Sequence, residues 1–148
     1  MSRLVYVVVA ILIGGLLALQ PGFNADVARR IGSPLGAGLI SIFVSLLVAG
    51  AVLVVARQPV AWSAVLSMPA YLWLAGVLGV AFVVGALWLA PILGGSLLFA
   101  AIVAGQMIST TIADQVGIGG YQAHAFDPRR IVAIGLVLAG VWLFQRAA

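Results

Sequence analysis

The sequence predicts an all-α fold, a polytopic bundle of membrane-spanning helices, and this prediction rests on its composition and on how its charges are distributed. Of the 148 residues, 65% are hydrophobic and 7% are charged, whereas a soluble domain carries about 25% charged residues. The mean hydropathy is +1.29, and the apolar residues form long uncharged runs. Lipid admits only helices or closed barrels, because each backbone polar group must be satisfied internally. The alternating strands of about ten residues that build a barrel are absent, so we expect helices in a lipid bilayer.

The first two spans are predicted at residues 4–26 and 34–56, each long enough for the ~20 apolar residues of a membrane helix. The N-terminus resembles a secretory signal peptide, but a small-residue cleavage site is missing, and Gln20–Pro21 lies where cleavage would fall. We therefore interpret the first run as a span. Ser33–Pro34 predicts the start of the second helix, since a serine hydroxyl can cap a helix that begins with proline.

The next apolar run, residues 58–113, is long enough for two spans. Pro59 and Pro69 bracket a piece that contains a tryptophan, which favours a short segment at the membrane interface. Ser67 followed by Pro69 predicts a capped start for the third span, which we place at residues 69–89.

Pro91 and Gly94–Gly95 predict a tight turn between the third span and a fourth span at residues 95–114. Asp127–Pro128 predicts a capped start for a fifth span at residues 128–146. This last apolar run is shorter than the others. The chain therefore has five spans, or four if the last run lies at the membrane interface.

The residue types present exclude several classes of function. The chain contains no cysteine and a single histidine, His124, so we expect no disulfide and no metal site. Its seven arginines are spread over loop positions, which indicates membrane-flanking charges and not a nucleic-acid-binding patch. The sequence contains no phosphate-binding loop, no pair of catalytic acids and no serine–histidine–aspartate set. We therefore expect no enzyme, no catalytic residue and no cofactor, and any transport must be facilitated or coupled to an ion gradient.

The arginines are divided almost evenly between the two sides of the membrane. Five spans in a single transmembrane domain, residues 1–148, place the termini on opposite sides. One side then carries Arg3, Arg57, Arg129 and Arg130, and the other carries Arg29, Arg30 and Arg146. The positive-inside rule orients a protein by this difference, which is almost nil here. Either another signal sets the orientation, or a span is miscounted, or the chain inserts both ways and two opposed copies pair about an axis in the membrane plane.

Polar residues within the first span are candidate binding groups, because such groups are costly in lipid unless they face a partner or a wet cavity. Gln20 and Asn24 lie one helical turn apart on the same face. Pro21 between them frees a backbone carbonyl one turn earlier and can kink the helix. The two amides can bind a ligand or join the first helix to a neighbour.

The fourth span carries the second candidate cluster, in which Gln106 shares a face with Ser109 or Thr110 while Thr111 lies off it. Serine and threonine can bond to the backbone carbonyl one turn earlier and do nothing else. Gln106 lacks such a local outlet, so it is the better candidate for substrate binding.

Three further features have a structural interpretation. Asp114 is the only acid adjoining a span's interior, and we favour its pairing with an arginine, such as Arg29 or Arg30 of a partner copy, with ion coupling as the alternative. Asp26 and Arg29 have the spacing of a charge pair at a helix end. Gly135 and Ala139 of the last span form a small-residue pair that suits a subunit contact, or ordinary packing of helices.

Polar residues recur inside apolar runs in three stretches of the chain: Leu19–Ala25 with Arg30–Pro34, Ala104–Met107 with Ile112–Gly117, and Arg130–Leu136 with Ala139–Val141. These stretches resemble the YdcZ-type family of the drug/metabolite transporter (DMT) superfamily, and the resemblance covers nearly the whole chain. It implies a five-helix bundle in the bacterial inner membrane that is similar to half of a ten-helix, EamA-like transporter. It also implies antiparallel pairing, as a dual-topology homodimer, with an oppositely oriented paralogue, or as a fusion.

The resemblance extends to the small multidrug resistance exporters, which use a glutamate in their first helix to exchange protons for cations. This sequence contains no glutamate, and Gln20 does not titrate, so that mechanism is not carried over. We predict a membrane transporter subunit that moves a small polar or amphipathic solute by alternating access as an antiparallel dimer. Gln20, Asn24 and Gln106 of both copies would line the cavity. The alternatives are a non-transporting assembly partner of a larger complex and a pore-forming module.

Overall fold

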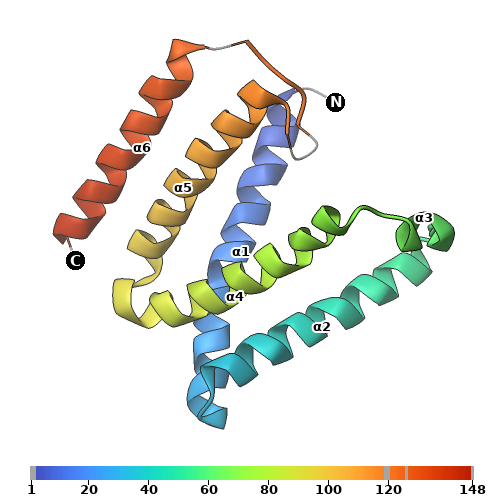
Figure 1. Ribbon diagram of the computed structural model, residues 1–148. Coiled ribbons are helices and arrows are strands. Elements are labelled where there is room, and N and C mark those ends of the chain that lie inside the picture. The colour runs from blue at the N-terminus through green and yellow to red at the C-terminus, as the bar shows by residue number, and fades with distance from the viewer. Residues whose placement is uncertain (1–2, 119–120, 126, 148) are drawn as a thin grey trace. The chain divides into compact units, whose positions relative to one another are not determined.

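The computed structural model describes residues 3–118, 121–125 and 127–147, and the regular structure in these ranges is entirely helical (Figure 1). The elements are α1 (Arg3–Ile31), α2 (Pro34–Val55), α3 (Trp62–Leu66), the 3-10 helix η1 (Ala70–Trp73), α4 (Leu74–Leu93), α5 (Gly95–Val116) and α6 (Pro128–Ala147). Within the described ranges, five helical segments are long and apolar enough to cross a membrane, with η1 and α4 forming one of them. The prediction of a polytopic bundle of five membrane helices is thereby confirmed.

The chain divides into two compact units, Met1–Ile92 and Leu93–Ala148. The first contains α1, α2, α3, η1 and almost all of α4, and the second contains α5 and α6. The organisation of all five spans as a single transmembrane domain stays a prediction.

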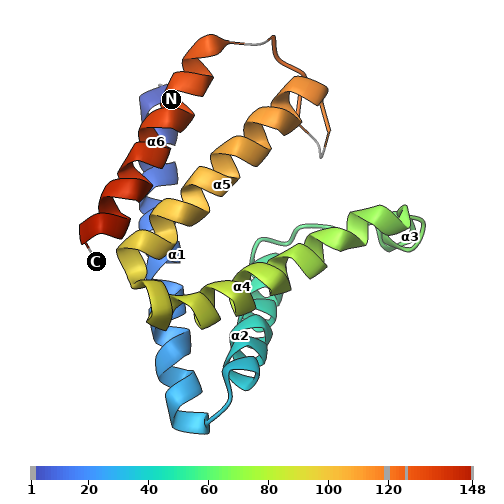
Figure 2. The ribbon, with the colours of Figure 1, turned by 60° about the vertical axis from the view of Figure 1, so that its left-hand side comes forward.

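In the first unit, α1 and α2 form a helical hairpin whose turn lies at Gly32 (Figures 1 and 2). Gly32 has a φ of 69°, a left-handed conformation that glycine adopts without steric cost. Ser33 then caps α2, because its Oγ accepts a hydrogen bond of 3.0 Å from the backbone N–H of Gly36. The predicted start of the second helix at Ser33–Pro34 is therefore confirmed. Helix α1 continues through Pro21 to Ile31, further than the predicted end of the first span.

The connection between α2 and α4 contains the short helix α3, as the bracketing prolines predict. The role predicted for Ser67 is wrong. Its hydroxyl donates a hydrogen bond of 3.1 Å to the carbonyl of Ala64, and Ser67 ends α3 instead of starting the next helix. A serine hydroxyl can bond back to the preceding turn, which competes with capping of a following helix.

Helix α4 packs against α2 where Gly38 removes a side chain. A Cβ at this position would lie 3.2 Å from Cγ2 of Val84, and Gly38, Ala86 and Leu87 are buried. The turn predicted at Pro91 begins later, because α4 continues through this proline to Leu93. Proline lacks only one helical hydrogen bond, whose loss a membrane helix tolerates near its end. The break comes at Gly94, whose φ of 72° ends the helical path.

In the second unit, α5 and α6 run side by side in opposite directions (Figures 1 and 2). Gly117, with a φ of 72°, terminates α5 in a left-handed conformation. Asp127 caps α6, because its Oδ1 accepts a hydrogen bond of 2.9 Å from the backbone N–H of Arg129. This confirms the predicted start of the last helix at Asp127–Pro128.

Candidate functional site

The amides of the first span lie where α1 faces α2. Nε2 of Gln20 donates a hydrogen bond to Oγ of Ser41 over 3.4 Å, and Ser41 lies on α2. Asn24, one turn further along α1, is buried with 8% of its surface exposed, and Pro21 between them is also buried. The side chain of Gln20 therefore has a polar partner inside its own helical hairpin. This supports the alternative that Gln20 joins the first helix to a neighbour.

The second cluster is arranged differently. Gln106 and Ser109 are exposed on α5, whereas Thr110 is half-buried. The Thr110 hydroxyl donates to the carbonyl of Gln106 over 2.7 Å and to that of Met107 over 3.4 Å. Thr110 is thus satisfied by its own helix, as is usual for threonine in apolar helices. The side chains of Gln106 and Ser109 form no hydrogen bond with any residue that the structure describes.

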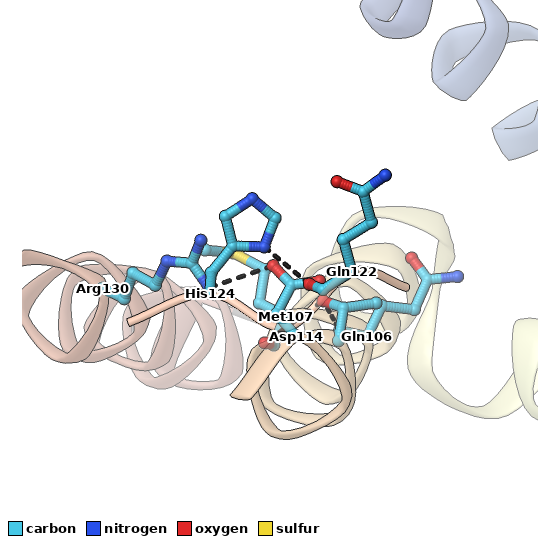
Figure 3. A network of polar contacts seen from close by, with 7 residues as sticks. Gln106, Met107, Asp114, Gln122, His124 and Arg130 are labelled. Atoms are coloured by element: carbon cyan, nitrogen blue, oxygen red, sulfur yellow. Dashed lines mark hydrogen bonds and ion pairs between the residues drawn. The ribbon is translucent and has the colours of Figure 1, made fainter. Parts of the chain in front are cut away.

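Asp114 forms an ion pair that joins α5 to α6. Its Oδ2 lies 3.0 Å from Nη1 of Arg130, and the two side chains are 25% and 33% exposed, respectively. The partner predicted from the sequence, Arg29 or Arg30 of another copy, differs from the partner that the structure provides. The α5–α6 hairpin explains this, since it returns the chain so that Arg130 of the same copy reaches the carboxylate. Figure 3 shows Arg130 and the amide of Gln106 on opposite sides of α5.

The loop after α5 folds back onto the same residue. The backbone N–H of His124 donates a hydrogen bond of 2.7 Å to the carbonyl of Asp114, and the His124 ring nitrogen Nδ1 lies 2.7 Å from the carbonyl of Gln122 (Figure 3). His124 therefore holds the loop against the end of α5.

A small recess of ≈ 170 Å³ lies beside this ion pair, between α5 and α6. Its lining combines hydroxyl groups, the ion pair and two apolar side chains: Met107, Thr110, Thr111, Asp114, Arg130 and Ala133. The ion pair occupies the charged groups of the recess, so its geometry favours a structural role for Asp114.

The charged residues at the end of α1 pair as their spacing predicts, with Asp26 and Arg29 in direct contact. Gly135 and Ala139 are both exposed on α6, and a Cβ at Gly135 would meet no atom within 4 Å. This face of α6 is therefore open in the single chain. Among the described residues, no group of three or more histidine, cysteine, aspartate or glutamate side chains could hold a metal ion.

The structure brings the predicted residues together in two separate sets, Gln20 with Asn24 and Gln106 with Ser109 and Thr110. Two functional partners were missed from the sequence, Ser41 and Arg130. A signal for Arg130 was present, because Asp114 and Arg130 lie equally far before and after Gln122 in the chain. Residues equidistant from the turn of an antiparallel hairpin face each other, so the pair follows from the hairpin. Ser41 has a weaker signal, since it lies nearer to its turn than Gln20 does.

Comparison with known proteins identifies one family. The model of the family described as "Putative inner membrane exporter, YdcZ" matches residues 5–143. No curated protein and no solved structure shows significant similarity to the chain.

Proposed function

The chain belongs to the YdcZ family of inner membrane exporters, and from this membership we propose that it moves a small polar or amphipathic solute by alternating access as an antiparallel dimer. Membership makes it a multi-pass protein of the inner membrane and a membrane transporter. The alternating-access mechanism, the antiparallel dimer and the substrate class go beyond family membership and are our proposal.

The observation that carries the proposal is the even division of arginine between the two ends of the helices. Arg3 begins α1, Arg57 follows α2, and Arg129 and Arg130 begin α6. Arg29 and Arg30 end α1, and Arg146 ends α6. Four positive charges therefore oppose three across five spans, which leaves little electrostatic preference for one orientation. Two copies inserted in opposite directions would reproduce the symmetry of inverted-repeat transporters.

The polar face of α5 supports a cavity between the copies. The amide of Gln106 is exposed on a helix that crosses the membrane, and lipid tails offer it no hydrogen bond. A water-filled cavity or a partner copy would satisfy this amide. We assign Gln106 and Ser109 to the substrate cavity as its primary groups.

Gln20, Asn24 and Thr110 are secondary groups of the proposed cavity, because Gln20 and Thr110 already have hydrogen-bond partners in the chain. Because these groups are neutral, the cavity favours a small polar or amphipathic solute over a strongly charged one. Asp114 serves structure by holding α6 and does not couple an ion, while Gly135 and Ala139 provide the open face of α6 for the contact between copies.

The orientation is tested by placing a single cysteine after Arg146, which is possible because the chain contains no cysteine of its own. A membrane-impermeant maleimide is applied to right-side-out and inverted vesicles. We expect labelling from both sides, each at about half of the total. Labelling from one side only would contradict the dual-topology homodimer and would point to an oppositely oriented paralogue as the partner.

The cavity is tested with Gln106→Ala in proteoliposomes, using a panel of polar and amphipathic dyes and metabolites. We expect saturable uptake by the wild-type protein and a reduction of about tenfold or more in the variant, because one lost hydrogen bond to a desolvated solute costs about 1.5 kcal/mol. Gln115→Ala is the matched control, since Gln115 is exposed on the same helix. Equal transport by both variants would remove Gln106 from the site, and flux that does not saturate would indicate a pore.

A further inference from the structure

Two apolar clefts that share lining residues lie at the turn between α1 and α2, with residues of α4 on their other side. The first has a volume of ≈ 270 Å³ and is lined by Ala25, Ala28, Arg29, Leu87 and Pro91, together with Pro34 and Trp88. The second has a volume of ≈ 390 Å³ and is lined by Gly32, Ser33, Leu35, Val84 and Gly85, together with the same Pro34 and Trp88. Pro34 and Trp88 therefore form the wall between the two clefts.

Positive charge gathers at one end of this pair of clefts. Arg29 lines the first cleft, and Arg30 follows it in the last turn of α1. Asp26 contacts Arg29 and neutralises one of the two guanidinium charges. The N-terminus of α2 begins at the same turn, and its dipole adds a partial positive charge. One full positive charge and a helix N-terminus thus remain to attract an anion.

The aromatic residue at the wall fits a position at the membrane interface. Trp88 is 66% exposed, although it lies between two apolar clefts. Tryptophan gathers at the level of lipid headgroups, where its ring is apolar and its N–H is wet. The α1–α2 turn, which holds both arginines, follows the first span, and the end of α4 that carries Trp88 closes the third span. Two crossings separate them, so both lie at the same membrane surface.

From this arrangement we propose that the α1–α2–α4 junction binds an anionic phospholipid, with one acyl chain in each cleft and the phosphate held mainly by Arg30, beside Arg29 and the N-terminus of α2. The charge complementarity selects the headgroup, since guanidinium groups bind phosphate in a fixed, paired geometry. The two clefts on either side of Trp88 match the two chains of a diacyl lipid. The proposal of this site does not depend on the proposed substrate cavity.

The test measures lipid binding to the purified full chain in detergent by native mass spectrometry. Phosphatidylglycerol and phosphatidylcholine with identical acyl chains are the two probes. We expect phosphatidylglycerol to bind more tightly than phosphatidylcholine. Arg30→Gln should weaken phosphatidylglycerol binding by roughly fivefold and leave phosphatidylcholine binding unchanged. Arg29→Gln should have a smaller effect, because Asp26 already neutralises its charge. Arg3→Gln, at the other end of α1, is the matched control and should change neither affinity. Equal binding of both lipids by the wild-type protein would overturn the proposal.

A second variant tests the clefts separately from the charge. Gly85→Leu should fill part of the second cleft, because Gly85 lines it and a Cβ at this position would meet no atom within 4 Å. We expect this variant to weaken the binding of both lipids by a similar factor. Raising the salt concentration should weaken the binding of phosphatidylglycerol, and not of phosphatidylcholine, to the wild-type protein. This measurement needs no variant, so the test stays valid if a variant fails to fold. Dissociation of a dimer by Gly85→Leu, with lipid binding unchanged, would show that a second copy fills the clefts and would overturn the proposal.

Discussion

The two helical hairpins of the molecule, α1–α2 and α5–α6, start from the same local design and are held together by different chemistry. In each, a capping residue followed by proline begins the second helix, with Ser33 in the first hairpin and Asp127 in the second. Across the helices, however, α1–α2 is joined by a neutral hydrogen bond from Gln20 to Ser41. The α5–α6 hairpin is joined by the ion pair of Asp114 and Arg130.

This difference shows where polar groups are free to act. In α1–α2 the amide of Gln20 already has a partner within the hairpin. In α5–α6 the ion pair lies on the side of α5 that faces α6, and the amide of Gln106 extends to the other side (Figure 3). The first hairpin therefore uses its polar residue for cohesion, and the second leaves one available for a ligand or a second copy.

The largest expected effect comes from breaking the ionic contact. Arg130→Leu leaves the carboxylate of Asp114 only partly exposed and unpaired, so we expect a loss of about 2 kcal/mol in the free energy of unfolding, between the values for buried and surface pairs. The measurement is reversible unfolding in mixed micelles. The double variant Asp114→Leu with Arg130→Leu should recover most of this loss. A double variant as unstable as Arg130→Leu alone would show that the ion pair is not the dominant contact.

An intermediate effect should be common to both hairpins. Ser33→Ala and Asp127→Ala each remove a capping oxygen from a backbone N–H, and we expect each to reduce the free energy of unfolding by about 1 kcal/mol. Ser45→Ala serves as the control, because the Ser45 hydroxyl bonds to the carbonyl of Ser41 one turn earlier, within α2, and does not lie at a helix start. If only one of the two capping variants is destabilised, the shared design of the hairpins is refuted.

The smallest effect is expected at the neutral contact. A double-mutant cycle of Gln20→Ala and Ser41→Ala should give a coupling energy of about 0.6 kcal/mol, which is typical of hydrogen bonds between membrane helices. Transport by Gln20→Ala in proteoliposomes sharpens the comparison. If Gln20 mainly joins helices, the Gln20→Ala variant should lose less transport activity than the Gln106→Ala variant. A coupling energy of zero together with abolished transport would instead assign Gln20 to the substrate.

The five spans could be predicted from the sequence because each depends on a property that is local in the chain. Long uncharged runs specify the helices, and Ser33–Pro34 and Asp127–Pro128 specify two of their starts. Helix ends were less predictable. Pro91 resembles a turn residue, yet the helix continues to Leu93, since an apolar environment retains every helical hydrogen bond that proline does not remove.

The candidate site could be predicted only as a list of polar residues. Which of them are satisfied depends on contacts between helices, and those contacts depend on the direction that each helix face takes. The sequence marks Asp114 as needing a cation, but seven arginines compete for it until the hairpin brings Arg130 into reach. Gln20 and Gln106 resemble each other in the sequence, and only the presence of Ser41 beside one of them separates the two.

Asp114 has a double attachment that bears on how this protein can be engineered. Its carboxylate holds α6 and its backbone carbonyl holds the amide of His124, so the path of the α5–α6 connection is set at the same point as the contact between the helices. Shortening that connection would pull the chain away from one attachment or the other. An epitope or a fusion partner is therefore better inserted between Arg57 and Ala61, where the chain is mostly exposed and connects two helices without such a tether.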